Sequence, residues 1–99
     1  MVDAVADNEA FSKEFVIKNR LGLHARAAAQ FVRLVNKFKS DVTLSKDGFE
    51  INGKSILGVL SLAAVKGTKL RIAAKGQDAE QALEEIETLV ESGFGEGVQ

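Results

Sequence analysis

The spacing of the hydrophobic residues changes repeatedly along this chain, and that change constrains the fold more than any other feature. Some short stretches alternate apolar and polar residues, which is the period of a strand with one buried face. Other stretches repeat apolar residues every three or four positions, as in a helix with one buried stripe. Strands are predicted at 13–19, 40–46, 49–52 and 68–76, and helices from residue 25, over 54–67 and over 78–93.

The resulting order, βαββαβα, predicts an α+β fold. Each helix has one apolar stripe and each strand has one apolar face, so a single layer of helices on one face of a sheet buries both. We therefore expect an open-faced β-sandwich, with a four-stranded antiparallel sheet and three helices on one face. This domain is expected to span 13–93, between a flexible acidic extension at 1–12 and a loose tail at 94–99.

Several residues mark the expected ends of these elements. Asp47-Gly48 is a strong hairpin signal between two strands. Ser55 is expected to cap the second helix, and Asp78 is expected to cap the third with Gln81 as its capping-box partner. Gly93 is expected to end that third helix.

The composition excludes several classes of protein. The 99 residues include no cysteine and one histidine, which excludes disulfides, thiolate metal sites and a structural zinc site. With a net charge of -1, the chain lacks the excess of positive charge that is typical of proteins that bind nucleic acid. No apolar run reaches membrane-spanning length, and the acidic N-terminus does not resemble a signal peptide. We expect a monomeric cytoplasmic protein without metal, cofactor, nucleic-acid partner or membrane insertion.

The single histidine, His24, lies at the predicted start of the first helix, in the stretch GLHARAAAQF (22–31). A lone histidine is more often an ordinary surface residue, so a functional role for His24 has to be inferred from its position in the fold. The first N–H groups of a helix have no internal partner, and the helix dipole is positive at that end. That field favours a neutral, nucleophilic imidazole and a bound anion at the same place.

Arg26 adds a guanidinium whose donors match phosphate oxygens. The sequence therefore predicts that His24 accepts a phosphoryl group, which Ala25, Arg26 and Ala27 bind at the helix start. No phosphate-binding loop of the GxxxxGK[ST] type and no acidic cluster for magnesium accompany this site. The donor and the acceptor of the phosphoryl group are then expected to be other proteins, and the chain itself is not expected to be an enzyme.

GLHARAAAQF, followed by NGKSILGVLSLAA (52–64), resembles the HPr family of histidine-containing phosphocarriers, from about Glu14 to Gly93. The resemblance implies the HPr fold, phosphorylation of His24 on Nδ1 by phospho-Enzyme I, and transfer to an EIIA domain. It implies that phosphoenolpyruvate is the primary donor and that Arg26 neutralises the phosphoryl charge. It also implies that Ser55 is the regulatory serine that HPr kinase/phosphorylase modifies in hosts that have this enzyme.

One position departs from the family pattern, because Ala27 stands where the family usually has proline. Proline is favoured in the first turn, where its missing N–H costs nothing. Alanine keeps the helix and leaves one more free N–H near the site, so we expect the carrier function to survive.

The second predicted helix has more large apolar residues than one buried face needs. We expect Leu57, with Ile56 or Leu60, to form an exposed docking patch near His24; the alternative is that all of them are buried. Arg33 on the first helix is expected to complement acidic partners. A phosphate on Ser55 would place negative charge on this surface.

Three other functions compete with the phosphocarrier. A purely regulatory HPr-like module would act through Ser55, but such a module needs neither His24 nor Arg26. A nitrogen-related phosphorelay module without sugar transport is poorly separated from a sugar-linked carrier. A module that binds RNA or a metabolite on its open sheet is disfavoured, because the chain has no tyrosine or tryptophan.

Overall fold

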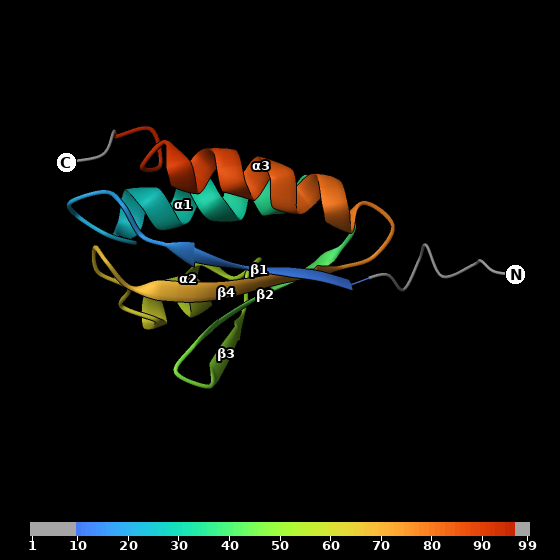
Figure 1. Cartoon of the computed structure of the whole chain (residues 1–99), viewed down its shortest axis with the longest axis horizontal. Helices are drawn as coiled ribbons and strands as arrows, with labels where there is room; N and C mark the ends of the chain where they lie inside the picture. The colour runs from blue at the N-terminus through green and yellow to red at the C-terminus, as the bar shows by residue number, and fades with distance from the viewer. Residues whose placement is uncertain (1–9, 97–99) are drawn as a thin grey trace, which may run out of the picture.

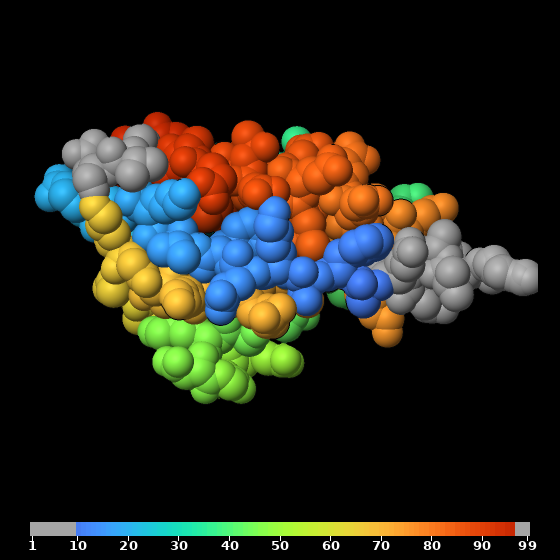
Figure 2. Space-filling model, in the orientation of Figure 1, coloured from blue at the N-terminus to red at the C-terminus, as the bar shows by residue number. Residues whose placement is uncertain are grey.

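The computed structural model describes residues 10–96, and its elements follow the predicted order βαββαβα. They are β1 (Ala10–Val16), α1 (Ala25–Val35), β2 (Asp41–Lys46), β3 (Phe49–Asn52), α2 (Ile56–Ser61), β4 (Lys69–Lys75) and α3 (Ala79–Glu91). Figure 1 shows α1 and α3 together on one side of the sheet, where they pack against each other. Figure 2 shows β1 and α3 side by side on one face of the molecule.

The four strands form one antiparallel sheet in the order β1-β4-β2-β3. β4 is central and shows the predicted alternation, because Leu70, Ile72 and Ala74 are buried while Lys69 and Arg71 are exposed. Since successive side chains point to opposite faces, one face of the sheet is apolar and the other is polar. The helices cover the apolar face, which confirms the predicted open-faced architecture.

Each long helix contributes one apolar stripe to the core. The buried residues of α1 are Ala27, Ala28, Phe31 and Val35. Those of α3 are Ala79, Ala82, Leu83, Ile86 and Val90. The small residues at the start of α1 let its first turn sit close to the rest of the core, and this fixes the place of His24 directly before it.

The first strand starts earlier than predicted. Residues 10–12 belong to β1 and pair with 73–75 of β4, so the expected flexible extension does not reach residue 12. The strand ends at Val16, and residues 17–19, predicted as its last part, begin the loop that leads to His24. Residues 1–9 of the predicted extension lie outside the described residues.

The end of the domain also differs from the prediction. Phe94 is buried, so the expected loose tail does not begin at residue 94. Phe94 has a φ of 57° and lies between Gly93 and Gly95, with φ of 67° and 81°. These left-handed residues turn the chain back after α3, and Phe94 anchors the turn in the core. Residues 97–99 of the predicted tail lie outside the described residues.

The second helix is shorter than the predicted segment 54–67. Ser55 caps it as expected, since its Oγ accepts a hydrogen bond from the Gly58 N–H at 3.1 Å. The helix stops at Ser61, and Ala63 takes a left-handed φ of 50° that no α-helix can continue.

The predicted capping box at the start of α3 is wrong. Asp78 makes no side-chain bond to the first turn of α3, although it precedes that helix. Its carboxylate instead accepts from the N–H groups of Lys39 and Ser40 and from the Ser40 hydroxyl. Gln81 donates to Glu85 rather than reaching back to the cap. Asp78 therefore joins α3 to the end of the α1–β2 connection.

Candidate functional site

His24 is the N-cap of α1. Its backbone is extended, with a φ of -79° and a ψ of -177°, and its carbonyl accepts the Ala28 N–H at 2.8 Å. The imidazole lies over the first turn, where Nδ1 accepts a hydrogen bond from the Arg26 N–H at 3.3 Å. The structure thus confirms the prediction that the ring lies at the N-terminal end of this helix, where the helix dipole is positive.

The other ring nitrogen of His24 faces a carboxylate. Nε2 lies 2.5 Å from Oε2 of Glu96. The two neighbours are satisfied together when Nε2 carries the proton and donates to Glu96, while Nδ1 keeps its lone pair for the Arg26 N–H. These partners favour the tautomer in which Nδ1 is unprotonated.

Glu96 is held by a buried amide. Nδ2 of Asn19 donates to Oε1 of Glu96 at 3.0 Å and to the Gly22 carbonyl at 2.9 Å. The hydrogen bond from Asn19 lowers the pKa of Glu96 below its ordinary value, and the hydrogen bond from His24 and the charge of Arg26 lower it further. Glu96 therefore remains an ionised acceptor beside the ring.

The loop before His24 is held against the connection between α2 and β4. The Leu23 N–H donates to the Ala64 carbonyl at 2.8 Å. Gly22 has a φ of 70°, and a Cβ there would lie 2.5 Å from that same carbonyl oxygen, so the close approach requires glycine. Figures 1 and 2 show the β1–α1 loop and the end of α3 at the same end of the molecule.

A hollow of about 250 Å³ opens beside the imidazole and is lined by Arg20, Leu21, His24, Arg26 and Glu96. Two guanidinium groups outnumber the one carboxylate, so the hollow suits an anion. The imidazole is 28% exposed, which leaves it accessible to a partner protein. The predicted residues His24 and Arg26 come together here, whereas Arg20 was not predicted.

The two alanines beside Arg26 are placed differently. Ala25 is exposed, but the side chain of Ala27 is completely buried in the core. Only the backbone of Ala27 is therefore able to face a phosphoryl group at the start of α1.

The predicted docking patch is present in part. Leu57 is 77% exposed and Ile56 is 40% exposed, on a helix that packs against α1. Leu60, in contrast, is half-buried and packs against the core, so it does not belong to an exposed patch. Arg33 is exposed in the last turn of α1, as expected.

Sequence reasoning missed Glu96 and Asn19. Glu96 lies 72 positions after His24, and Asn19 lies outside any recognised motif. The two residues are 77 positions apart. The only local signal is the stretch SGFGEG (92–97), in which glycines flank an aromatic residue, as in a turn with a buried anchor.

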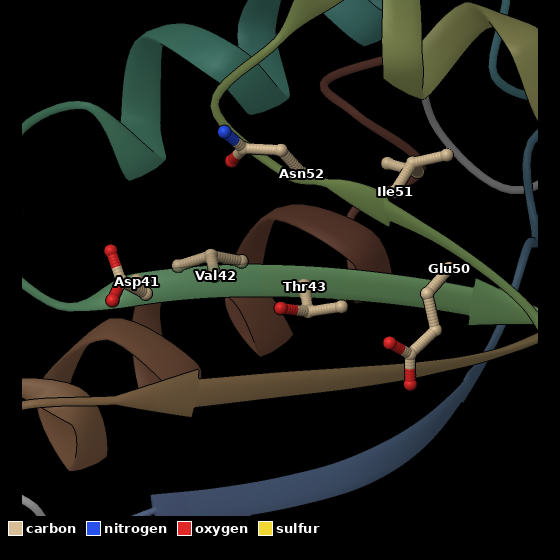
Figure 3. A pocket seen from close by; sticks show the side chains of 6 residues that line it. All are labelled: Asp41, Val42, Thr43, Glu50, Ile51 and Asn52. Carbon is tan, nitrogen blue, oxygen red and sulfur yellow. The ribbon is translucent and has the colours of Figure 1, made fainter.

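A second hollow, of about 410 Å³, lies along β2 and β3 (Figure 3). Figure 3 shows Asp41 and Thr43 on β2, with Glu50 on the neighbouring strand. Asn52 completes its polar lining and accepts a hydrogen bond from the Lys54 N–H at 2.9 Å. The two carboxylates make this hollow unsuitable for a phosphoryl group.

Among residues 10–96, no helix is long and apolar enough to cross a membrane.

Comparisons with known proteins agree with the resemblance. Residues 11–92 match the family described as "PTS HPr component phosphorylation site". The chain is 46% identical over 83 residues to phosphocarrier protein HPr of Xylella fastidiosa, which covers 84% of this chain and 93% of that protein. It is 45% identical over 75 residues to the HPr-like protein Crh of Bacillus subtilis, covering 76% and 88% of the two chains. The crystal structure of HPr from Thermoanaerobacter tengcongensis is similar with a TM-score of 0.84 and 42% identity, covering 87% of this chain and 97% of that one.

Proposed function

Because the chain belongs to the HPr family, the phosphocarriers of the phosphotransferase system, we propose that Nδ1 of His24 is the atom that carries the phosphoryl group. A carrier of this family is not itself an enzyme. The proposal rests above all on one observation, the place of Nδ1 over the first turn of α1 while Nε2 lies 2.5 Å from the Glu96 carboxylate.

The proposed step is a direct displacement at phosphorus. The lone pair of Nδ1 attacks the phosphorus of phospho-Enzyme I, whose phosphoryl group comes from phosphoenolpyruvate. The new P–N bond forms on His24 while the bond to the donor breaks. Transfer to an EIIA domain is the same step with this chain as the donor. Because phosphoenolpyruvate feeds the relay, we place the protein in the cytoplasm.

The residues around Nδ1 support this step by charge. Arg26 lies exposed in the first turn of α1 and lines the same hollow as His24. With the N–H groups of Ala25, Arg26 and Ala27, it offers donors to the three phosphoryl oxygens. Such fixed donors stabilise charge that develops during transfer, because they need no reorganisation.

The partners are proposed to dock on Arg33, Ile56 and Leu57. Exposed apolar side chains beside a basic helix suit the mixed apolar and acidic surface of a partner. We expect Leu57→Ser to raise the KM of Enzyme I for this carrier about 10-fold, without a change in stability. Phe49→Ser is the matched control, since Phe49 is 58% exposed on β3 and outside the proposed surface. An equal effect of both changes would refute this docking site.

Ser55 is proposed as the regulatory site for HPr kinase/phosphorylase. Its hydroxyl is half-buried as the cap of α2 and lies directly before Ile56 and Leu57. A phosphate there would add about two negative charges beside the apolar docking patch. It would oppose docking on an acidic partner without touching His24.

The decisive experiment is phosphoryl transfer in solution. The purified chain is incubated with Enzyme I and phosphoenolpyruvate, and intact mass and acid lability are measured. We expect one acid-labile phosphoryl adduct that is lost in His24→Ala. An unmodified, folded protein would overturn the carrier role for the Enzyme I used, and would favour the regulatory module.

The regulatory alternative cannot be judged from overall identity. The chain is nearly as similar to the HPr-like protein Crh as to an HPr. The arrangement of His24, Arg26 and Glu96 is what favours the carrier, because a module that acts only through Ser55 needs none of these contacts.

A further inference from the structure

Asn19 is a fully buried polar residue that takes no part in the transfer step proposed above. Its Nδ2 uses both protons, one on the Gly22 carbonyl and one on Oε1 of Glu96. Its Oδ1, in contrast, is buried and has no hydrogen-bond partner among residues 10–96. A buried carbonyl without a donor is unfavourable, so an apolar residue would be the simpler choice at this position.

The orientation of this amide is fixed by its surroundings. Turning it over would set Oδ1 against the Gly22 carbonyl and the Glu96 carboxylate, which are both acceptors. The amide therefore gives its two protons to the two segments that flank the imidazole. One is the loop that ends at His24, and the other is the turn after α3.

That turn is built to bring a carboxylate back to the site. Phe94 is buried in a left-handed conformation, and Gly95 follows with a φ of 81°. A bulky residue adopts such a φ only where the surrounding structure enforces it. The result is that Glu96, whose side chain is only 18% exposed, lies between Asn19 and Nε2 of His24.

We propose that Asn19 is a positioning residue that acts through Glu96, and that this pair holds His24 in the tautomer with an unprotonated Nδ1. The inference rests on the proposed function, because it assigns a purpose to the tautomer in phosphoryl transfer. Asn19 fixes one oxygen of the carboxylate, and the other oxygen accepts the Nε2 proton. A carboxylate that orients a catalytic imidazole in this way is a general device of histidine chemistry.

The pair also has a role during transfer. When Nδ1 forms its bond to phosphorus, the ring becomes positively charged and the proton stays on Nε2. The Glu96 carboxylate then faces a cation instead of a neutral ring, so its interaction strengthens as the bond forms. Because only interactions that strengthen along the reaction speed it, Glu96 is expected to raise the rate of acceptance rather than the affinity for the donor.

The ionised state of Glu96 supports this arrangement. The hydrogen bond from Asn19 is the largest cause of the lowered pKa of Glu96, ahead of its contacts with His24 and Arg26. Removing the amide would thus loosen the carboxylate and weaken its preference for the charged form.

The test combines ring NMR with transfer kinetics on the full chain. Long-range proton–nitrogen spectra of ¹⁵N-histidine-labelled protein report which ring nitrogen carries the proton. We expect the wild type to be mainly the Nε2–H tautomer, and Asn19→Ala and Glu96→Gln to be mixtures. Each change is also expected to lower the rate of phosphorylation by Enzyme I about 10-fold at unchanged KM, as for other groups that orient a functional histidine. Glu91→Gln is the matched control, because within the described part of the chain Glu91 pairs only with Lys18, on the surface.

The double variant separates this role from simple packing. If Asn19 acts through Glu96, Asn19→Ala adds nothing to Glu96→Gln in either the tautomer ratio or the rate. Additive losses, or a tautomer ratio that Glu96→Gln leaves unchanged, would overturn the inference. Should Asn19→Ala fail to fold, Glu96→Gln alone still decides the tautomer question. A wild type that takes up no phosphoryl group would defeat the proposed function instead, while the tautomer measurement would stand by itself.

Discussion

Asp78 supplies a sharp test of how the fold is held together. Its Oδ2 accepts the Lys39 N–H at 2.9 Å, and its Oδ1 accepts the Ser40 N–H at 2.9 Å and the Ser40 hydroxyl at 2.5 Å. These contacts lower the pKa of Asp78 below its ordinary value of 3.8, with the Ser40 hydroxyl as the largest cause and the Lys39 N–H as the next. The carboxylate is thus more stable ionised in the folded protein than in the unfolded chain.

The loss of stability expected for each variant of Asp78 depends on which hydrogen-bond donors the substitution leaves without an acceptor. Asp78→Asn keeps an oxygen for Ser40 but sets an NH₂ group against the exposed Lys39 N–H, so we expect a loss of about 1–2 kcal/mol near pH 7. Asp78→Ala removes the carboxylate that accepts from both the N–H and the hydroxyl of Ser40, and Ser40 is only 1% exposed, so bulk solvent does not reach these donors. We expect that variant to lose about 2–4 kcal/mol.

The same contacts predict how stability depends on pH. A carboxyl group whose folded-state pKa is lowered contributes stability that is complete above its unfolded-state pKa and is lost as the pH falls through the folded-state pKa. The difference in free energy of unfolding between wild type and Asp78→Asn should therefore shrink as the pH falls from about 7 to about 2.

Urea denaturation followed by circular dichroism measures this difference at each pH. Asp47→Asn is the control, because Asp47 is exposed at a φ of 53°, a conformation that asparagine also accepts. A difference between wild type and Asp78→Asn that stays constant, or grows, as the pH falls would refute this account of the Asp78 contacts.

Three further changes test the backbone around the site. Ala63→Gly should raise the free energy of unfolding by up to about 1 kcal/mol, because it relieves a φ of 50° at some cost in chain entropy; a loss of stability in urea would contradict this. Gly22→Ala should cost about 3 kcal/mol or more and abolish phosphorylation, since the new Cβ meets the Ala64 carbonyl; a stable, active variant would show that the loop before His24 is adaptable. Ala27→Pro should keep phosphorylation and add about 0.4–1 kcal/mol of stability in urea, because it restricts the unfolded chain; a carrier that loses phosphorylation would identify the Ala27 N–H as a required phosphate ligand.

The parts of the fold that could be predicted from sequence are those set by local patterns. The period of the apolar residues gave the element order, and Ser55 shows that a cap can be recognised from one residue at a helix start. His24 was placed correctly for the same reason, since a loop glycine and a change of period mark the start of α1. Each of these features depends on neighbours within a few positions.

The parts that were missed depend on contacts between distant segments. Asp78 looked like a helix cap, but Ser40, 38 positions earlier, offers it better donors. Leu60 looked available for docking, but the fold packs it against the core. Glu96 lay within the predicted loose tail at 94–99, and the burial of Phe94 brings it to His24. No local pattern encodes these pairings, because the partners meet only after the sheet and helices have assembled.

The open geometry of the site suits a carrier better than a phosphate-binding site that retains its ligand. A group that must leave again should be bound by charges that solvent partly screens, since fully enclosed charges hold an anion much more strongly. The hollow beside His24 contains two arginines, one carboxylate and a ring that is 28% exposed, so its net attraction for an anion is moderate. In the proposed mechanism Glu96 has two effects: its negative charge reduces the attraction for the phosphoryl oxygens, and its carboxylate stabilises the ring cation to which phosphorus is bound. Because the proton stays on Nε2 while Nδ1 carries phosphorus, the ring can leave as a neutral imidazole when the group is passed on, and a neutral imidazole is a better leaving group than the imidazolate that a deprotonated ring would form.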